Sequence, residues 1–501
     1  MSPPAAPGLR RLYVSAATLS LIAACHGADP DPSRVDRGSR PTSGGTRPSV
    51  VLVTVDTLRA DHLPIYGYDR RTAPAISAMA TDAVVFENAF TTAPKTAPAY
   101  ASMFTGMYPF RHGLRLLGQE LHRDNVTLAE RMTAAGYQSA GFVSSTVMID
   151  RLSLLGQGFA VWDDRMPQRE LNRDNYQRRA ERTIDAVLKW LPDDGKPFFL
   201  FIHLIDPHGP YRPPAAFRGS FEPRRRRKLR ADEVPGFQRV PGAEYLGDYI
   251  AGYDGEIAYA DSQIARLFDR LSEEGLYDNS LVIVTADHGE SFGEDGYFFR
   301  HGKTLHESSI HVPLVIKPPG GRSANAAPRS SSIVSLTDVA PTILDYAGLA
   351  PLADADGISL KPVVEGQARP EDRAVFSERW LPGRRSWAIH ATAMSLRAEN
   401  CAEGAFAGIE ACSETCMART DSGERVVIER DSARRQRLRA SLDSFIKQAA
   451  THELPFEVLW RYRPRDKEFV RRFIAQHNLQ ARHYETPDSD ALEALGYLEN
   501  E

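Results

Sequence analysis

The sequence has 501 residues, of which 42% are hydrophobic and 25% are charged, and these values are ordinary for globular domains. This length predicts one large domain with a smaller one, or two to three domains. The formal net charge of −4 is small for such a chain and argues against a dedicated nucleic-acid binder. With only 4 Cys, the fold cannot depend on a disulfide framework.

Residues 1–25 have the pattern of a secretory signal. Arg10 and Arg11 precede an apolar run over residues 12–24, and Cys25 follows. That run is too short to span a bilayer as a mature helix, and small residues before Cys25 are typical of a cleavage site. The tetrad Ile-Ala-Ala-Cys at 22–25 resembles the lipobox of bacterial lipoproteins, which implies a lipidated Cys25; the alternative is an ordinary cleaved signal. We therefore expect an exported protein of the cell envelope, on the periplasmic side, held at a membrane by a lipid anchor.

Residues 26–48 are rich in Pro, Gly, Ser, Asp and Arg and predict a flexible tether.

A catalytic domain is expected from 49 to 370. Uninterrupted apolar runs are typical of strands buried on both faces, and they occur at 49–55, 198–205, 281–286 and 312–317. Helical patterns lie between them, at about 127–135 and 253–274, and each ends at a glycine. Buried strands that alternate with helices predict an α/β fold with a mostly parallel sheet.

A smaller C-terminal subdomain is expected from 371 to 501. It follows a helix predicted over 338–347, which has Pro341 in its first turn. Short strands and turns are expected up to residue 428, and an exposed helix over 430–450. Cys401, Cys412 and Cys416 lie here, and an oxidising envelope compartment favours one disulfide among them. The sequence leaves the three pairings open.

Acidic and histidine side chains follow three of the predicted strands. Asp56 ends the first strand, Asp206-Pro207-His208 the second and Asp287-His288 the third. Because ligands of open α/β sheets bind at the carboxyl ends of the strands, these side chains are expected at one edge. Carboxylate and imidazole groups together suit a divalent metal, whereas a single Asp after a strand is usually a turn former.

Residues 96–106 predict a helix that starts at Thr96. Thr96 is a good N-cap, and Pro98 falls in the first turn. The unpaired N–H groups and the positive end of the helix dipole would stabilise a threonine alkoxide and the anionic group being transferred to it. The alternative is that Thr96 serves only as a cap.

Six motifs, in order along residues 49–366, resemble the sulfatase family of the alkaline phosphatase superfamily. They lie at 53–61, at 66–67 with 72–74, at 96–109, at 286–290, at 301–307 with 312–313, and at 338–342 with 357–360. The resemblance implies an α/β/α sandwich around a large mixed sheet. It also implies an enzyme that uses a divalent metal to hydrolyse sulfate or phosphate esters.

The resemblance assigns roles to individual residues. The metal ligands would be Asp56, Thr96, Asp287 and His288. The catalytic groups would be Thr96 as the nucleophile, with His208 and His301, which would contact the oxygens of the substrate. Apart from the resemblance, we expect Lys303 and Tyr100 to bind substrate. Lys303 adjoins His301 in the sequence, and the alternative is that it is an ordinary exposed lysine. The cofactor would be zinc, manganese or calcium, and the partner an anionic ester substrate.

Departures from the family pattern bear on the chemistry. Sulfatases proper oxidise a Cys or Ser to formylglycine, which Thr96 cannot become, and Tyr100 stands at the family's Arg position. Thr57 replaces a second Asp, and the Lys-x-His pair expected near Gly141 is absent. The remaining set, with one Asp and a Thr before Asp-His, resembles phosphoethanolamine transferases and lipoteichoic acid synthases. A formylglycine hydrate can release sulfate by elimination, and a sulfate ester of threonine has no such route. A phosphate ester of threonine can be cleaved, because a metal-activated water can attack phosphorus in line. The chemistry therefore favours phosphoryl transfer, and the family resemblance favours sulfate.

Two other functions stay open. One is a phosphotransferase, although relatives of that type carry several membrane spans and no such span is predicted here. The other is a non-catalytic binding lipoprotein, which the missing Arg, Asp and Lys-x-His pair would suit. The joint presence of Asp56, Thr96, Asp287 and His288 favours an enzyme over this second alternative. The sequence does not indicate an oligomeric state.

Overall fold

The computed structural model describes residues 47–169, 176–367, 373–381, 384–391, 394–402, 412–419, 425–427, 433–451, 458–461 and 481–484. The expected signal, almost all of the tether and the expected boundary at 370 lie outside these residues and stay predictions. In the part of the chain that is described, no helix combines the length and the apolar character needed to cross a membrane.

The centre of the fold is an eight-stranded sheet in the order β12-β2-β11-β8-β1-β7-β3-β4. Its strands are β1 (Ser49–Val55), β2 (Val84–Phe90), β3 (Gln138–Phe142), β4 (Val161–Asp163), β7 (Phe198–Leu204), β8 (Ser280–Thr285), β11 (His311–Lys317) and β12 (Arg329–Ser335). β1 pairs in parallel with β7 and β8, whereas β11 is antiparallel to both of its neighbours. The sheet is therefore mixed, as the family resemblance implied.

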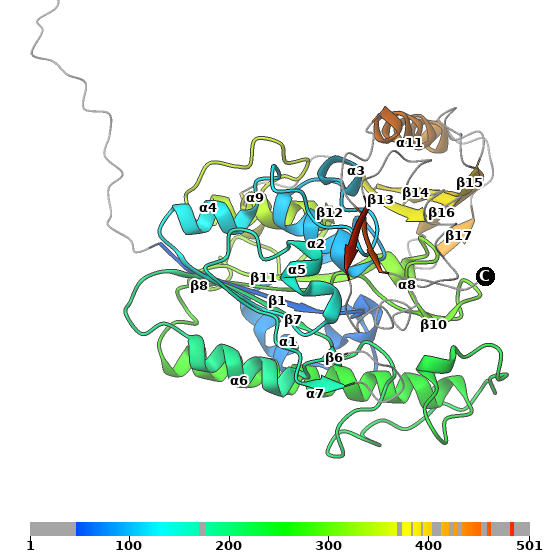
Figure 1. The fold of residues 1–501 in the computed structure, drawn as a ribbon, viewed down its shortest axis with the longest axis horizontal. Coiled ribbons are helices and arrows are strands. Elements are labelled where there is room, and N and C mark those ends of the chain that lie inside the picture. The colour runs from blue at the N-terminus through cyan, green and yellow to red at the C-terminus, as the bar shows by residue number, and fades with distance from the viewer. Residues whose placement is uncertain are drawn as a thin grey trace, which may run out of the picture. The chain divides into compact units, whose positions relative to one another are not determined.

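Helices cover both faces of this sheet (Figure 1). One layer contains α1 (Pro74–Met79), α6 (Ala180–Trp190) and α7 (Leu246–Glu273), and the other contains α2 (Thr96–Thr105), α4 (Leu128–Ala134) and α9 (Val339–Tyr346). Shorter elements include α3 (Pro109–His112), α5 (Asp150–Ser153), α8 (Glu307–Ile310), α10 (Lys361–Val364), β9 (Ser291–Phe292) and β10 (Phe298–Arg300). All residues of β1 are buried because both faces are covered, which explains its uninterrupted apolar run. The predicted α/β/α sandwich is confirmed.

The helix α7 begins earlier than predicted. Its pattern suggested a start near Tyr253, but the structure starts it at Leu246. The added turns contain Gly247, where a Cβ atom would lie 2.3 Å from the backbone oxygen of Arg224. Gly247 thus lets the loop before α7 pass directly over the helix, and the low helix propensity of glycine concealed this role in the sequence.

The C-terminal part contains a five-stranded antiparallel sheet in the order β13-β14-β15-β16-β17. These elements are β13 (Val375–Leu381), β14 (Arg384–Ala391), β15 (Met394–Ala402), β16 (Ser413–Arg419) and β17 (Arg425–Val427), followed by α11 (Ala433–Thr451). α11 contacts β14 and β15 and buries Leu438, Leu442 and Phe445 against them. The small α+β subdomain is confirmed, but the helix predicted to be exposed has a buried face.

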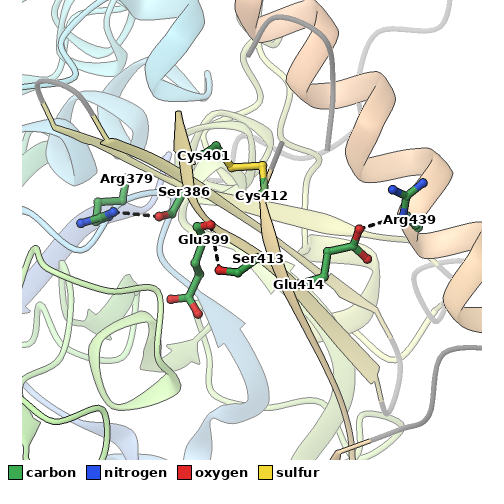
Figure 2. Close-up of a disulfide and its surroundings, with 8 residues drawn as sticks. All are labelled: Arg379, Ser386, Glu399, Cys401, Cys412, Ser413, Glu414 and Arg439. Atoms are coloured by element: carbon green, nitrogen blue, oxygen red, sulfur yellow. Dashed lines mark hydrogen bonds and ion pairs between the residues drawn. A yellow bond between two sulfur atoms is a disulfide. The ribbon is translucent and has the colours of Figure 1, made fainter. Parts of the chain in front are cut away.

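A disulfide joins Cys401 on β15 to Cys412, which directly precedes β16 (Figure 2). Cys416 is buried without a disulfide. The sequence had left this pairing open. Nearby, Ser413 Oγ donates to the carbonyl of Glu399 over 3.0 Å and thereby joins the same two strands. The disulfide therefore links β15 to the start of β16, where the two strands are already joined by a hydrogen bond.

Replacing Cys401 and Cys412 together with serine is expected to lower the free energy of unfolding by about 2–3 kcal/mol, because a short loop of the unfolded chain is no longer closed. The sequence separation is 11 residues. Denaturant unfolding of the double variant measures this, and Cys416→Ala is the control that removes a cysteine without breaking the disulfide. Equal midpoints for the double variant and the parent protein would contradict the prediction.

Candidate active site

The carboxyl ends of β8, β1 and β7 meet at one edge of the sheet, because these strands are parallel neighbours. Asp56 directly follows β1, and Asp287 and His288 follow β8 after Ala286. One ligand atom from each of these three side chains lies within 4.8 Å of the others. The structure thus brings together three of the residues that the sequence placed at this edge.

Each Asp of this cluster presents one oxygen to the other ligand atoms. Asp287 Oδ1 accepts hydrogen bonds from the backbone N–H groups of Thr57 (3.3 Å) and His288 (2.9 Å). Asp287 Oδ2 and Asp56 Oδ1 are buried and have no hydrogen-bond partner among the described residues. His288 Nδ1–H donates to the carbonyl of Gly289 over 2.9 Å, so Nε2 is the acceptor nitrogen of the neutral ring. This Nε2 lies 3.3 Å from Asp287 Oδ2 and 3.9 Å from Asp56 Oδ1.

This arrangement fits a divalent cation. Two carboxylate oxygens and one imidazole nitrogen are the ligand types that zinc and manganese accept in proteins. Burial, together with the negative charge of Asp287, raises the pKa of Asp56 well above its ordinary value. Two buried carboxylates with unpaired oxygens are costly unless a positive charge compensates them. A cation bound by Asp56, Asp287 and His288 would supply that charge.

Thr96 lies beside the cluster at the start of α2. Its Oγ1 is 3.2 Å from His288 Nε2, and the residue is 1% exposed. The N-cap is Lys95, and no side chain caps the helix, so Thr96 is the first helical residue and not the cap that the sequence suggested. The difference matters, because the Thr96 hydroxyl points to His288 instead of to its own helix. The positive end of the helix dipole lies at the same place.

His208 and His301 both lie near the cluster. The ring centroid of His301 is 4.3 Å from that of His288 and 5.2 Å from that of His208. His208 Nδ1–H donates to the carbonyl of Gly209 over 2.9 Å, which places Nε2 as the acceptor of its neutral ring. Imidazoles at these positions can give or take a proton at a bound ester.

Lys303 lies on the same loop as His301 and is half-buried. The intervening Gly302 packs against Lys95, because a Cβ atom on Gly302 would lie 2.9 Å from Lys95 Cε. Lys95, which is 6% exposed, thus runs along the loop that carries His301 and Lys303. Lys95 directly precedes Thr96 in the chain, so one cationic residue adjoins the site, and substrate contact by Lys303 stays a prediction.

Tyr100 and Asp206 do not join the cluster. The Tyr100 hydroxyl donates to Thr54 Oγ1 over 2.9 Å, and the ring packs edge-on against Phe201 in the core. The geometry therefore gives no support to the substrate-binding role expected for Tyr100. Asp206 pairs with Arg179 at 2.7 Å and accepts a hydrogen bond from the N–H of Ala180, at the start of α6. Of the motif after β7, only His208 reaches the site.

Residues 48–349, which are more than half of the chain, match the family model described as Sulfatase. The chain belongs to the sulfatase family. Members of this family are ester hydrolases of the alkaline phosphatase superfamily, so the protein is a hydrolase of that class.

Curated relatives of this sulfatase-family protein carry names of two kinds. An arylsulfatase from Clostridium perfringens is 25% identical over 386 residues, which cover 64% of this chain and 79% of the relative. A multifunctional alkaline phosphatase superfamily protein from Trinickia caryophylli is 26% identical over 408 residues, covering 65% and 79% of the two chains. Among solved structures, a phosphonate monoester hydrolase from Agrobacterium radiobacter aligns with a TM-score of 0.64 and 20% identity, covering 81% of this chain and 96% of that one. This last likeness establishes the fold alone.

The sequence did not identify His203, whose side chain hydrogen-bonds to Asp56. His203 lies on β7, and its Nδ1 accepts the backbone N–H of Ser144 over 3.2 Å. Its Nε2–H therefore donates to Asp56 Oδ2, 3.3 Å away. Burial lowers the pKa of His203 to about 4, so the ring is neutral near pH 7. A polar residue inside the apolar run 198–205 was the available signal.

The turn after Asp56 is also clamped by a residue that the sequence did not single out. Thr57 has a φ of 57°, an unusual backbone conformation for a β-branched residue. The Tyr253 hydroxyl, from α7, donates to the carbonyl of Thr57 over 2.7 Å and accepts the N–H of Arg59 over 2.9 Å. Such strain is maintained only where surrounding structure holds it, and here it directs the Thr57 N–H toward Asp287.

Proposed function

We propose that this sulfatase-family hydrolase cleaves phosphate or phosphonate esters through a covalent intermediate on Thr96 and requires a divalent cation. The observation that supports this most directly is the distance of 3.2 Å between Thr96 Oγ1 and His288 Nε2. It puts the only hydroxyl of the predicted catalytic set beside the two carboxylates. Sulfate esters are the second candidate class.

The cation would be held by Asp56, Asp287 and His288, with Thr96 next to it. When bound, it would lower the pKa of the Thr96 hydroxyl and offset the negative charge of the ester. Lys303 and the N-terminus of α2 supply further positive potential to that group. His203 and the backbone N–H groups of Thr57 and His288 keep the two carboxylates oriented.

The reaction has two balanced steps. In the first, the Thr96 oxygen bonds to phosphorus as the bond to the leaving oxygen breaks; the hydroxyl proton passes to water. His208 or His301 gives a proton to the leaving oxygen. In the second, a water oxygen bonds to phosphorus as the bond to Thr96 breaks; one proton of that water passes to the Thr96 oxygen and the other stays with the product, and the histidine regains from solvent the proton that Thr96 released in the first step.

Phosphate and phosphonate esters are favoured over sulfate esters because of the way in which an ester on Thr96 can be cleaved. A formylglycine hydrate can expel sulfate by elimination, but Thr96 has no second hydroxyl on its Cβ atom. Its ester must be cleaved at the central atom, which is the normal course of phosphoryl transfer. The arylsulfatase from Clostridium perfringens among the relatives is the reason to keep sulfate esters as the alternative.

A panel of 4-nitrophenyl esters tests this proposal. The substrates are 4-nitrophenyl sulfate, 4-nitrophenyl phosphate, bis(4-nitrophenyl) phosphate and 4-nitrophenyl phenylphosphonate, each assayed with protein supplied with zinc, manganese or calcium. We expect turnover of a phosphorus ester that stops after chelation and returns when metal is added. Turnover of the sulfate ester alone would overturn the preference for phosphorus. Turnover that withstands chelation would overturn the cation requirement.

We further propose that the protein is held at the envelope through Cys25, which lies outside the described residues. The disulfide between Cys401 and Cys412 supports export, because disulfides persist in oxidising compartments. In a bacterial host, Cys25→Ala is expected to move the protein from the membrane fraction to a soluble fraction, with Cys416→Ala as the control. An unchanged membrane fraction would contradict lipid anchoring at this residue.

A further inference from the structure

Gln238 is a buried amide that contacts both of the loops that carry His208 and His301. It ends the 3₁₀ turn η5 (Gly236–Gln238), in the segment between β7 and α7, and it is 1% exposed. Its Nε2–H donates to the backbone carbonyl of Phe299 over 3.1 Å, two residues before His301. None of the steps described above uses Gln238.

The same amide lies directly against Gly209, the neighbour of His208. A Cβ atom on Gly209 would lie 1.9 Å from Gln238 Oε1 and 2.5 Å from its Cδ, so the side chain of Gln238 fills the space that a side chain at position 209 would need. The absence of a Cβ atom at Gly209 is what permits this close approach. Because His208 Nδ1 bonds to the carbonyl of Gly209, Gln238 contacts the residue that holds His208.

Phe299 is held in an unusual backbone conformation. Its φ is 54°, which is rare for a bulky residue. Its ring is fully buried and stacks on Tyr249 of α7, with ring centroids 4.3 Å apart. The Tyr249 hydroxyl also accepts the N–H of Val240, two residues after Gln238. Such a conformation persists only where neighbouring groups hold it, so Gln238 and Tyr249 together fix the start of the loop that carries His301.

Packing alone does not account for an amide at this position. Gln238 Oε1 is buried and meets no hydrogen-bond donor among the described residues, which costs free energy. A methionine would fill a similar space without that cost. What only the amide supplies is the hydrogen bond to the carbonyl of Phe299. The two loops that it contacts carry imidazoles whose ring centroids are 5.2 Å apart.

We propose that Gln238 is a positioning residue that joins the loop of His208 to the loop of His301 and thereby sets the spacing of the two imidazoles at the bound ester. This rests on the proposed function, in which one of these histidines protonates the leaving oxygen. Proton transfer needs its partners within hydrogen-bond reach, and a displacement of about 1 Å can lower a rate by about 100-fold. Gln238 acts through the histidines and does not itself contact the ester.

Gln238→Met tests this, because it keeps the length of the side chain and removes the hydrogen bond. On the best ester of the panel we expect kcat to fall about 10-fold and KM to change less than about threefold. Gln263→Met is the matched control and should keep the kcat of the wild type. Gln263 lies on α7, is 9% exposed, and donates to Ser262 Oγ over 3.0 Å. A wild-type kcat for Gln238→Met would overturn the proposal.

A variant cycle separates positioning from a general effect on the fold. In a protein that already carries His208→Ala and His301→Ala, Gln238→Met should have no further effect on kcat, because the groups that it positions are gone. A further loss of about 10-fold would mean that Gln238 acts by another route, such as the cation cluster, and would overturn the proposal. The 4-nitrophenyl ester is used here, since its leaving group needs protonation least and leaves a measurable rate.

Two further measurements apply if Gln238→Met fails to fold. Gly209→Ala displaces the Gln238 side chain without removing it, and its loss of kcat should likewise vanish in the protein without the two histidines; a loss that persists there would overturn the proposal.

A readout independent of turnover comes from ¹³C-labelled histidine in protein supplied with zinc. The ring signals of His208 and His301, identified by their loss in the two alanine variants, should shift in Gly209→Ala and in Gln238→Met but not in Gln263→Met. Unchanged signals would overturn the proposal. A failure of the proposed function is distinct, because Thr96→Ala would then keep its activity whatever the ring signals show.

Discussion

Replacing Thr96 with alanine is expected to lower kcat by about 10⁴-fold or more while leaving the fold intact, because it removes the attacking oxygen from the site. Thr96 is 1% exposed at the first turn of α2, and alanine has a higher helix propensity than threonine. The measurement is kcat on the best ester of the panel, together with thermal unfolding. Rapid quenching of the wild type should also yield a phosphorylated peptide that contains residue 96.

Two variants serve as controls for this result. Thr96→Ser keeps a hydroxyl at the same position and should retain part of the activity. Thr105→Ala removes a buried threonine from the other end of α2, where its Oγ1 donates to the carbonyl of Ala101, and should alter stability without abolishing turnover. Thr96→Ala with turnover like that of the wild type would remove Thr96 from the mechanism and leave the cluster to another role.

The cluster could be predicted because it follows directly from the strand pattern. β1 and β8 are buried on both faces, so each appears as an apolar run with an Asp just after it. Parallel neighbours end at one edge, and this edge brings Asp56 and Asp287 together. The same reasoning also placed Asp206 at this edge, but in the structure its carboxylate pairs with Arg179. Arg179 comes from a distant segment, so the sequence around β7 does not reveal this partner.

The remaining strands were hidden because polar residues interrupt them. β2 carries Glu87 and Asn88 in its interior, and β12, at the edge of the sheet, begins with an arginine and three serines. Edge strands need no continuous apolar run, because one side is open to solvent. Their number and order follow from pairing between distant segments, which local patterns do not specify.

Partners of the site residues were the least predictable part. His203 is a single polar residue within an apolar run, and its importance depends on Asp56, the residue that faces it in the fold. Tyr100 illustrates the opposite case, since a motif position suggested substrate contact and the hydroxyl instead bonds to Thr54. A motif fixes where a residue stands along the chain, but the direction of its side chain depends on packing.

A second large effect is expected where the C-terminal sheet joins the catalytic part. Glu378 on β13 and Arg115 form a two-fold hydrogen-bonded ion pair, with Nε to Oε1 at 2.7 Å and Nη2 to Oε2 at 3.0 Å. Both side chains are buried, at 2% and 5% exposure. The backbone N–H of Glu378 also donates to the carbonyl of Thr92 over 2.8 Å, in the segment that leads to Thr96. β13 is thus fixed to the chain just before the proposed nucleophile.

Glu378→Ala is expected to lower the free energy of unfolding by about 3–5 kcal/mol, because it leaves the Arg115 guanidinium buried without its carboxylate. Arg115→Met combined with Glu378→Leu should cost less than Glu378→Ala, since no charge is then left unpaired. Denaturant unfolding measures the stability of both variants and of a control, Arg329→Met. The control breaks the more exposed ion pair with Glu87 and should change stability by less than about 1 kcal/mol.

Because β13 is bonded to Thr92, we also expect Glu378→Ala to lower kcat more than Arg329→Met does. Equal losses of stability in Glu378→Ala and Arg329→Met would show that burial of the Arg115 pair does not control how firmly the C-terminal sheet is attached.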